Sequence, residues 1–162
     1  MKTLLAIVAL SLLVCTAPAG TIKLPKSKPL ATITFPAGWK ATPEEDNFEA
    51  ESADEEIYLY AEVIDSDSVE AALKESVAYL EKEKVMMKAD TKKESKGEVN
   101  GIPVVDVSFD GTDKDGPCKI SLTFLVLSKE KCISMFYWAS EEGEKKHAEE
   151  LKQIFNSIKR AE

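Results

Sequence analysis

The sequence has little of what enzymes and metal proteins most often use at their sites. It contains one histidine, His147, so the chain cannot supply two histidine ligands to a metal ion. It contains no glycine-rich phosphate loop, no G-x-S-x-G elbow and no C-x-x-C pair. His147 stands four residues before Leu151 and seven before Ile154, at the edge of an apolar helical stripe, so we expect a hydrogen-bonded boundary residue there. We therefore expect no enzyme, with activity from a carboxylate pair in a cleft as the least favoured alternative, and no catalytic, cofactor-binding or metal-binding residue.

Cysteine is also scarce. Beyond the first twenty residues the chain has only Cys118 and Cys132. If residues 128–131 form a hairpin turn, Leu127 faces Cys132 and Cys118 lies opposite about Glu141. The two sulfurs would then be roughly 30 Å apart, at about 3.3 Å per strand residue. A disulfide needs Cα atoms within about 7 Å of each other, so we expect two unpaired, buried cysteines.

Long hydrophobic runs are absent except at the N-terminus. Lys2 is followed by the apolar run 4–14 and then by the small-x-small pattern 17–19. This order is typical of a secretory signal peptide, and we expect cleavage after Ala19 to leave Gly20 as the mature N-terminus. The run is too short to cross a bilayer as a stable helix, so no transmembrane helix is expected. The protein is predicted to be exported, as a periplasmic or secreted protein.

Cys15 lies within this leader. A lipoprotein signal places its cysteine directly after a small residue, whereas Cys15 follows Val14. Lipoprotein anchoring through Cys15 is therefore the less favoured alternative.

Positive charge is in deficit. The net charge is −8, and Lys2 is the only charged side chain in residues 1–19, so their removal would leave −9. A negative domain repels phosphate backbones and anionic lipid, which argues against nucleic-acid binding and peripheral membrane docking. The acidic runs 44–46 and 54–56 are interpreted as solvated turns.

Hydrophobic periodicity predicts strands, a helix, further strands and a final helix. The helix is expected over residues 68–84, with Asp67 as its N-cap. A final helix is expected after the cap residue Ser140. The expected strands cover residues 30–35, 48–51, 57–64, 102–109, 119–127 and 132–139, with residues 91–99 as an edge strand or a long turn. This order predicts an α+β fold, an antiparallel β-sheet flanked by helices, in a single domain 30–162 that follows an extended leader 20–29.

The stretch from Asp110 to Gly116 is the one hint of a cation site. Calcium loops place acidic groups at alternating positions before a glycine and a glutamate six residues after it. Here Gly111 stands at one ligand position and Leu122 at the place of the glutamate, so the pattern fails twice. Turn chemistry explains the Asp-Gly pairs, and calcium binding at Asp110–Asp115 stays open.

The order of landmarks resembles the PsbP-like superfamily, which includes the photosystem II extrinsic subunit, nuclear Ran-binding proteins and DcrB-type bacterial envelope proteins. Residues 33–39 (ITFPAGW) resemble the F-x-P-x-G-W opening of that superfamily, followed in order by 100–103 (NGIP) and 154–158 (IFNSI). The resemblance covers about residues 30–160. It implies an antiparallel sheet sandwiched by helices, with Trp39 closing one end of the core and Gly38 permitting the turn before it. The matching positions are structural, so no functional residue carries over.

The resemblance and the predicted export together suggest a non-enzymatic accessory or adaptor protein that binds another envelope or secreted protein. Such a protein would display an exposed apolar or aromatic patch on one sheet edge or helix face. The candidate residues for the patch are Tyr58, Tyr60, Tyr137 and Trp138. The alternative is a carrier for a small ligand or a cation such as calcium, with a pocket between sheet and helix or at Asp110–Asp115. No cofactor is expected, and the sequence leaves the partner and the oligomeric state open.

Overall fold

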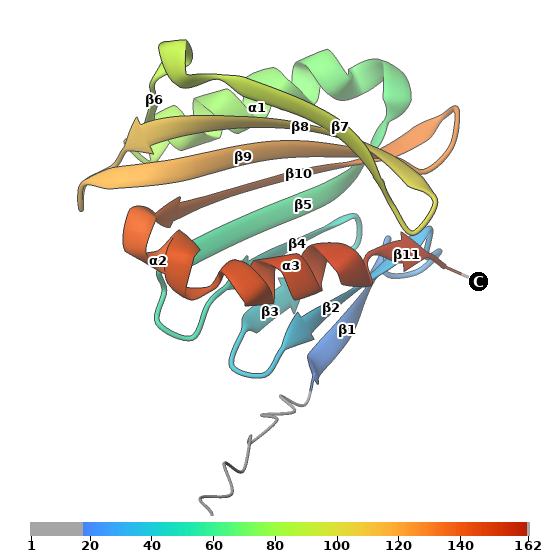
Figure 1. Cartoon of the computed structure of the whole chain (residues 1–162). Coiled ribbons are helices and arrows are strands. Elements are labelled where there is room, and N and C mark those ends of the chain that lie inside the picture. The colour runs from blue at the N-terminus through green and yellow to red at the C-terminus, as the bar shows by residue number, and fades with distance from the viewer. Residues whose placement is uncertain (1–17, 162) are drawn as a thin grey trace, which may run out of the picture.

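A large antiparallel sheet with helices on both faces organises the chain (Figure 1). The structure is a computed structural model that describes residues 18–161, so the expected signal peptide through position 17, including Cys15, lies outside the described residues. In spatial order the large sheet consists of β3 (Lys40–Pro43), β4 (Asn47–Glu51), β5 (Ile57–Asp65), β10 (Lys131–Ser140), β9 (Pro117–Val126), β8 (Ile102–Thr112) and β6 (Met86–Met87), and β7 (Lys93–Val99) also pairs with β8. The expected α+β fold is confirmed.

One face of this sheet is covered by α1 (Val69–Lys82). Leu80, on the side of the helix that faces the sheet, packs in one buried cluster with Ile120 and Leu122 of β9 and Phe136 of β10. The expected N-cap is wrong, because Asp67 lies in the 3₁₀ turn η1 (Ser66–Ser68) and Ser68 precedes the helix without a side-chain capping bond. A second 3₁₀ turn, η2 (Ala89–Thr91), links β6 to β7.

The opposite face carries α2 (Glu141–Lys146), α3 (Ala148–Ser157) and a three-stranded sheet (Figure 1). In this small sheet β2 (Ala31–Pro36) lies between β1 (Pro18–Leu24) and β11 (Lys159–Arg160). Residues 20–29, expected as an extended leader ahead of the domain, instead begin with a paired strand whose Ile22 and Leu24 are buried in the main core. The apolar pattern of this strand is short, and it does not indicate which strand will pair with it.

Trp39 closes one end of the main core, as the resemblance implied. Its ring packs 5.8 Å from that of Phe35, which in turn meets Phe48 edge-on at 5.5 Å. Gly38 adopts φ +95°, a backbone conformation that glycine reaches without a steric penalty. The turn that ends β2 therefore delivers the indole to the interior.

The β9–β10 hairpin is shifted by one residue from the expected pairing. Cys132 faces Val126 instead of Leu127, and Cys118 faces Ser140 instead of Glu141. The shift arises because the turn closes through hydrogen bonds from Leu127 and Ser128 to the carbonyl of Lys131, so Leu127 belongs to the turn. The two thiols still lie at opposite ends of the hairpin, and both are free and buried, as expected.

The final helix begins at the expected cap and breaks at His147. The Ser140 hydroxyl accepts a hydrogen bond from the Gly143 amide at 2.9 Å, which confirms the cap. The single helix expected after Ser140 is two helices, because His147 leaves the helical backbone conformation at φ −100°, ψ 12°. Within residues 18–161, no helix is both long and apolar enough to span a membrane.

Candidate functional site

Three of the four aromatic residues expected to form a patch lie on the α1 face of the large sheet. Tyr58, Tyr60 and Trp138 share that face because strand side chains alternate between the two sides. Tyr137 faces the other side, where its hydroxyl donates to Glu144 of α2 at 3.0 Å. The expected set of four is therefore split between the two faces.

Two further rings join the three on the α1 face into one aromatic cluster. Tyr79 of α1 stacks on Tyr58 with ring centroids 6.2 Å apart, and its hydroxyl donates to that of Tyr58 at 3.3 Å. Phe136 of β10 lies 5.3 Å from Tyr60 and 5.7 Å from Tyr79. Trp138 lies 4.5 Å from Tyr58. The cluster thus connects the helix to both central strands and is only partly covered by them.

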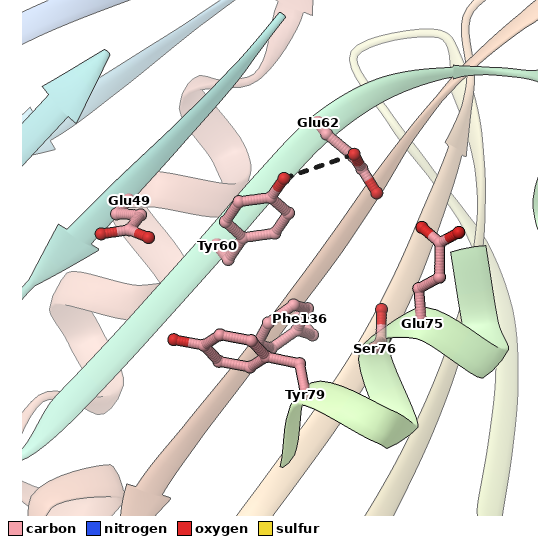
Figure 2. A pocket seen from close by; sticks show the side chains of 7 residues that line it. All are labelled: Glu49, Tyr60, Glu62, Glu75, Ser76, Tyr79 and Phe136. Carbon is pink, nitrogen blue, oxygen red and sulfur yellow. Dashed lines mark hydrogen bonds between the residues drawn. The ribbon is translucent and has the colours of Figure 1, made fainter. Parts of the chain in front are cut away.

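A hollow of about 270 Å³ opens beside this cluster, between α1 and strands β4, β5 and β10. We call it the Tyr60 pocket. It is lined by Glu49, Tyr60, Glu62, Glu75, Ser76, Tyr79 and Phe136 (Figure 2). The sheet supplies Tyr60, Glu62 and Phe136, while the helix supplies Glu75, Ser76 and Tyr79 from the other side. Volumes of this size suit a side chain or a small molecule.

The Tyr60 pocket is negative. Its described lining contains three carboxylates and no basic side chain. Partial burial raises the pKa of Glu62; the hydrogen bond from the Tyr60 hydroxyl, 3.3 Å long, lowers it in part, and the charge of Glu75 raises it again. Burial, with the charge of Glu62, also raises the pKa of Tyr60, so its hydroxyl stays protonated. The described lining of the pocket therefore offers carboxylates and ring faces and no basic side chain.

A second, wider hollow of about 520 Å³ lies at the other end of the cluster, and we call it the acidic cleft. Tyr58 and Trp138 contribute its aromatic wall. Its described acidic lining consists of Glu51, Asp54, Glu55, Glu56, Glu83, Asp113 and Asp115. Among the described residues that line it, the one basic side chain is Lys114, 3.8 Å from Asp115. The acidic run 54–56, interpreted from sequence as a solvated turn, thus forms one side of a cleft.

His147 is buried and hydrogen-bonded on both ring nitrogens, as expected. Its Nδ1 lies 2.8 Å from Glu150, and its Nε2 lies 3.0 Å from each carboxylate oxygen of Asp54. Burial lowers the pKa of His147, but the hydrogen bonds to Asp54 and Glu150 outweigh this effect and raise the pKa above its ordinary value.

The two carboxylates that bond His147 have further partners. Lys146 and Ser52 hold the pKa of Asp54 far below its usual range. Glu150 also accepts the Trp39 indole N–H at 2.7 Å. These hydrogen bonds hold the junction of α2 and α3 against the 52–56 loop.

The Asp110–Asp115 loop uses its carboxylates within the turn. Asp110 pairs with Lys119 at 2.7 Å. Asp113 accepts the backbone amides of Asp115 and Gly116 at 2.8 and 3.0 Å. Among residues 18–161, no three His, Cys, Asp or Glu side chains are grouped closely enough to hold a metal ion. Nothing in the loop geometry therefore favours calcium over ordinary turn chemistry.

Sequence reasoning missed several residues that line the two hollows. Glu62 follows Tyr60 at the strand period of two, a signal that places it on the same face. Tyr79 stands seven residues after Ala72 on the helical stripe, and Ser76 stands four after it. What no periodicity could reveal is that Tyr79 of the helix meets Phe136 of a strand far along the chain.

No protein-family model matches the chain, and no curated protein matches it by sequence. Its fold, however, is found in solved structures. The cyanobacterial PsbP (CyanoP) of Synechocystis sp. PCC 6803 superposes with a TM-score of 0.59 at 8% identity, over 88% of this chain and 92% of that one. LpqN of Mycobacterium tuberculosis, described as involved in cell envelope biogenesis, superposes with a TM-score of 0.58 at 10% identity, over 88% and 91%. The fold is therefore PsbP-like, as the resemblance implied.

A crystal structure from Bacteroides thetaiotaomicron VPI-5482 is also similar, with a TM-score of 0.55 at 11% identity. It covers 82% of this chain, but this chain spans only 46% of the Bacteroides protein. At these identities the likeness concerns the fold alone.

Proposed function

We propose that this is an exported, non-enzymatic accessory protein that binds a positively charged segment of another envelope or secreted protein. The observation that carries the proposal is the pair of hollows on the α1 face, the Tyr60 pocket and the acidic cleft, which share one partly exposed aromatic cluster and are rimmed by carboxylates. Aromatic side chains are the common anchors of protein interfaces, and complementary charge steers and orients the partner.

Two further considerations support the proposal. The predicted signal peptide directs the chain out of the cytoplasm. A structural neighbour, LpqN, is described as involved in cell envelope biogenesis, and the resemblance to the PsbP-like superfamily suggests an accessory role. The carboxylates would also select against acidic partners, since like charges brought together at an interface cost several kcal/mol.

Site-specific crosslinking tests the proposal. A photoreactive residue is placed at position 78, exposed on α1 beside the pocket residues, and in a second sample at position 153, exposed on α3 of the opposite face. Each mature chain, residues 20–162, is incubated with the native envelope fraction. We expect a discrete crosslinked protein from position 78 and none from position 153.

Charge reversal supplies the control. Glu75→Lys combined with Glu83→Lys should abolish the product obtained by a general lysine-reactive crosslinker. Glu142→Lys combined with Glu149→Lys, which changes the net charge equally on the opposite face, should leave it intact. Equal products from both faces, or a product insensitive to reversal at 75 and 83, would contradict the proposal.

A further inference from the structure

The Tyr60 pocket has the composition of a binding site for an organic cation. The rings of Tyr60, Tyr79 and Phe136 border one small space, with Phe136 within 5.3 Å of Tyr60 and 5.7 Å of Tyr79. The face of an aromatic ring carries partial negative charge and attracts a cation within about 6 Å of its centroid. Both strand and helix contribute rings, so the space is bounded on two sides (Figure 2).

The acceptors around this space come from different directions. Glu62 points in from β5, whereas Glu75 and Ser76 approach from α1 (Figure 2). Ser76 is only 6% exposed, and its hydroxyl points toward the space between Tyr60 and Glu75. A hydroxyl that faces the hollow can accept a hydrogen bond from a donor bound there. The pocket is thus equipped to accept several hydrogen bonds from one donor group.

The arrangement of the acceptors favours an ammonium over a metal ion or a guanidinium. Within residues 18–161 the carboxylates are not grouped closely enough to share a metal ion. A guanidinium is a planar fork that suits one carboxylate approached edge-on. An ammonium is compact and directs three N–H donors to different sides, which matches acceptors on the helix and on the sheet. Its aliphatic stem would lie against the rings.

Glu62 and Glu75 repel each other in the partly buried pocket. The pKa of Glu62 is raised by its burial and by the charge of Glu75, and no basic side chain among the described lining residues offsets them. A bound cation would remove that repulsion. The volume of about 270 Å³ is sufficient for one extended side chain and too small for a folded peptide segment.

We propose that the Tyr60 pocket binds a single alkylammonium group, contributed by a lysine side chain of the partner. The proposal rests on the proposed function only for the source of the amine. The pocket itself recognises the ammonium through the rings of Tyr60, Tyr79 and Phe136 and through Glu62, Glu75 and Ser76.

Small probes test the pocket without the partner. The ¹⁵N-labelled mature chain is titrated with Nα-acetyl-lysine amide, with n-butylammonium chloride, and with Nα,Nε-diacetyl-lysine amide, whose side chain is neutral. We expect saturable shifts at Tyr60, Ser76 and Tyr79 with both cations and at least tenfold weaker binding of the neutral compound. Equal binding of the neutral compound, or no saturable shift with either cation, would overturn the inference.

Matched variants separate the contacts. Glu62→Gln should weaken binding of acetyl-lysine amide about tenfold, as the loss of a charge-assisted hydrogen bond implies. Glu81→Gln, on the outer side of the same helix, should not change it. Tyr60→Phe should keep the affinity within about twofold because the ring remains, and Tyr60→Leu should lower it severalfold. Unchanged binding in Glu62→Gln, or equal losses in the two Tyr60 variants, would contradict the assignment of these contacts.

The outcomes distinguish this inference from the proposed function. If the amines bind but charge reversal at 75 and 83 leaves the crosslinked product intact, the pocket recognises free amines and the adaptor proposal fails. If the crosslinked product depends on those residues but neither amine binds, the adaptor proposal stands and the ammonium pocket is wrong.

Discussion

The Nε2 atom of His147 lies 3.0 Å from both carboxylate oxygens of Asp54, which stands 93 positions earlier in the chain. The Nδ1 atom of the same ring lies 2.8 Å from Glu150. Because ionised carboxylates only accept hydrogen bonds, an imidazole that bonds both must carry a proton on each nitrogen. His147 is therefore held as a cation between two anions, and it fastens the start of α3 to the 52–56 loop.

This arrangement makes stability depend on pH near neutrality. Because the pKa of His147 is raised in the folded state, its contribution is complete below the unfolded value of about 6.5 and is lost as pH rises through the folded value. Asp54 has the opposite sign: its lowered pKa gives a contribution present above 3.8 and lost only in acid. The free energy of unfolding should therefore fall as the pH rises from about 6.5 through the raised pKa of His147.

Urea unfolding of the wild-type chain and of His147→Gln at several pH values in that range checks this expectation. The variant should be less stable at pH 6 and should lose the pH dependence, since His147 is the only histidine. Parallel curves for the two proteins would show that His147 is not the titrating group.

Gly143 in α2 should not tolerate a side chain. A Cβ built there would lie 2.7 Å from the Cβ of Glu56 and 3.0 Å from the Ser140 hydroxyl. Gly143→Ala should destabilise the protein by about 1–3 kcal/mol through overpacking. Gly97→Ala in β7, where a Cβ would meet nothing within 4 Å, should be neutral or slightly stabilising. Thermal unfolding of the two variants would decide, and equal effects would refute the steric argument.

The guanidinium of Arg160 should hold the C-terminus to two turns. It donates to the Gly101 carbonyl at 2.9 Å and, through two nitrogens, to the Leu127 carbonyl at 3.1 and 3.2 Å. Arg160→Ala should lower the free energy of unfolding by about 1–2 kcal/mol. Lys159→Ala, an exposed neighbour in the same short strand, should change it by less than about 0.5 kcal/mol. Chemical denaturation measures both, and equal losses would assign the effect to the backbone of β11.

The two buried cysteines should be unreactive in the folded protein and should not bridge. Burial, with the charge of Asp113, raises the pKa of Cys118 to about 11, so little thiolate forms near neutral pH. In an assay with a chromogenic disulfide, the native mature chain should release almost no thiol signal. The same chain in concentrated guanidinium chloride should release two equivalents. A signal of zero after denaturation would reveal a disulfide and overturn the β9–β10 register.

The parts of the fold that depend on local patterning could be predicted from the sequence. The alternation of β5, β9 and β10 and the helical stripe of α1 are properties of short segments, and each lies within a few residues of its expected bounds. The Ser140 cap was also predictable, because a cap acts within three residues of itself. The separation of the cysteines survived a one-residue register error, since it depends on strand length.

The small sheet could not be predicted in the same way. It joins β1, β2 and β11 from the two ends of the described chain, and β11 has only two residues. So short a strand has no periodicity to read, and it forms only because α3 delivers it to the edge of β2. The break at His147 likewise coincides with a contact to Asp54, a residue far away in the chain.

The candidate site, too, was predictable from the sequence only where it depends on local patterning. The sequence by itself determined that Tyr58, Tyr60 and Trp138 stand at alternating strand positions and that the chain carries an excess of acidic residues. Only the tertiary structure decided that α1 lies beside β5 and β10 and brings Tyr79, Ser76 and Glu75 to Tyr60 and Glu62. Periodicity states which side of an element a residue occupies, whereas a pocket depends on which elements meet, and that is set by the packing of the whole chain.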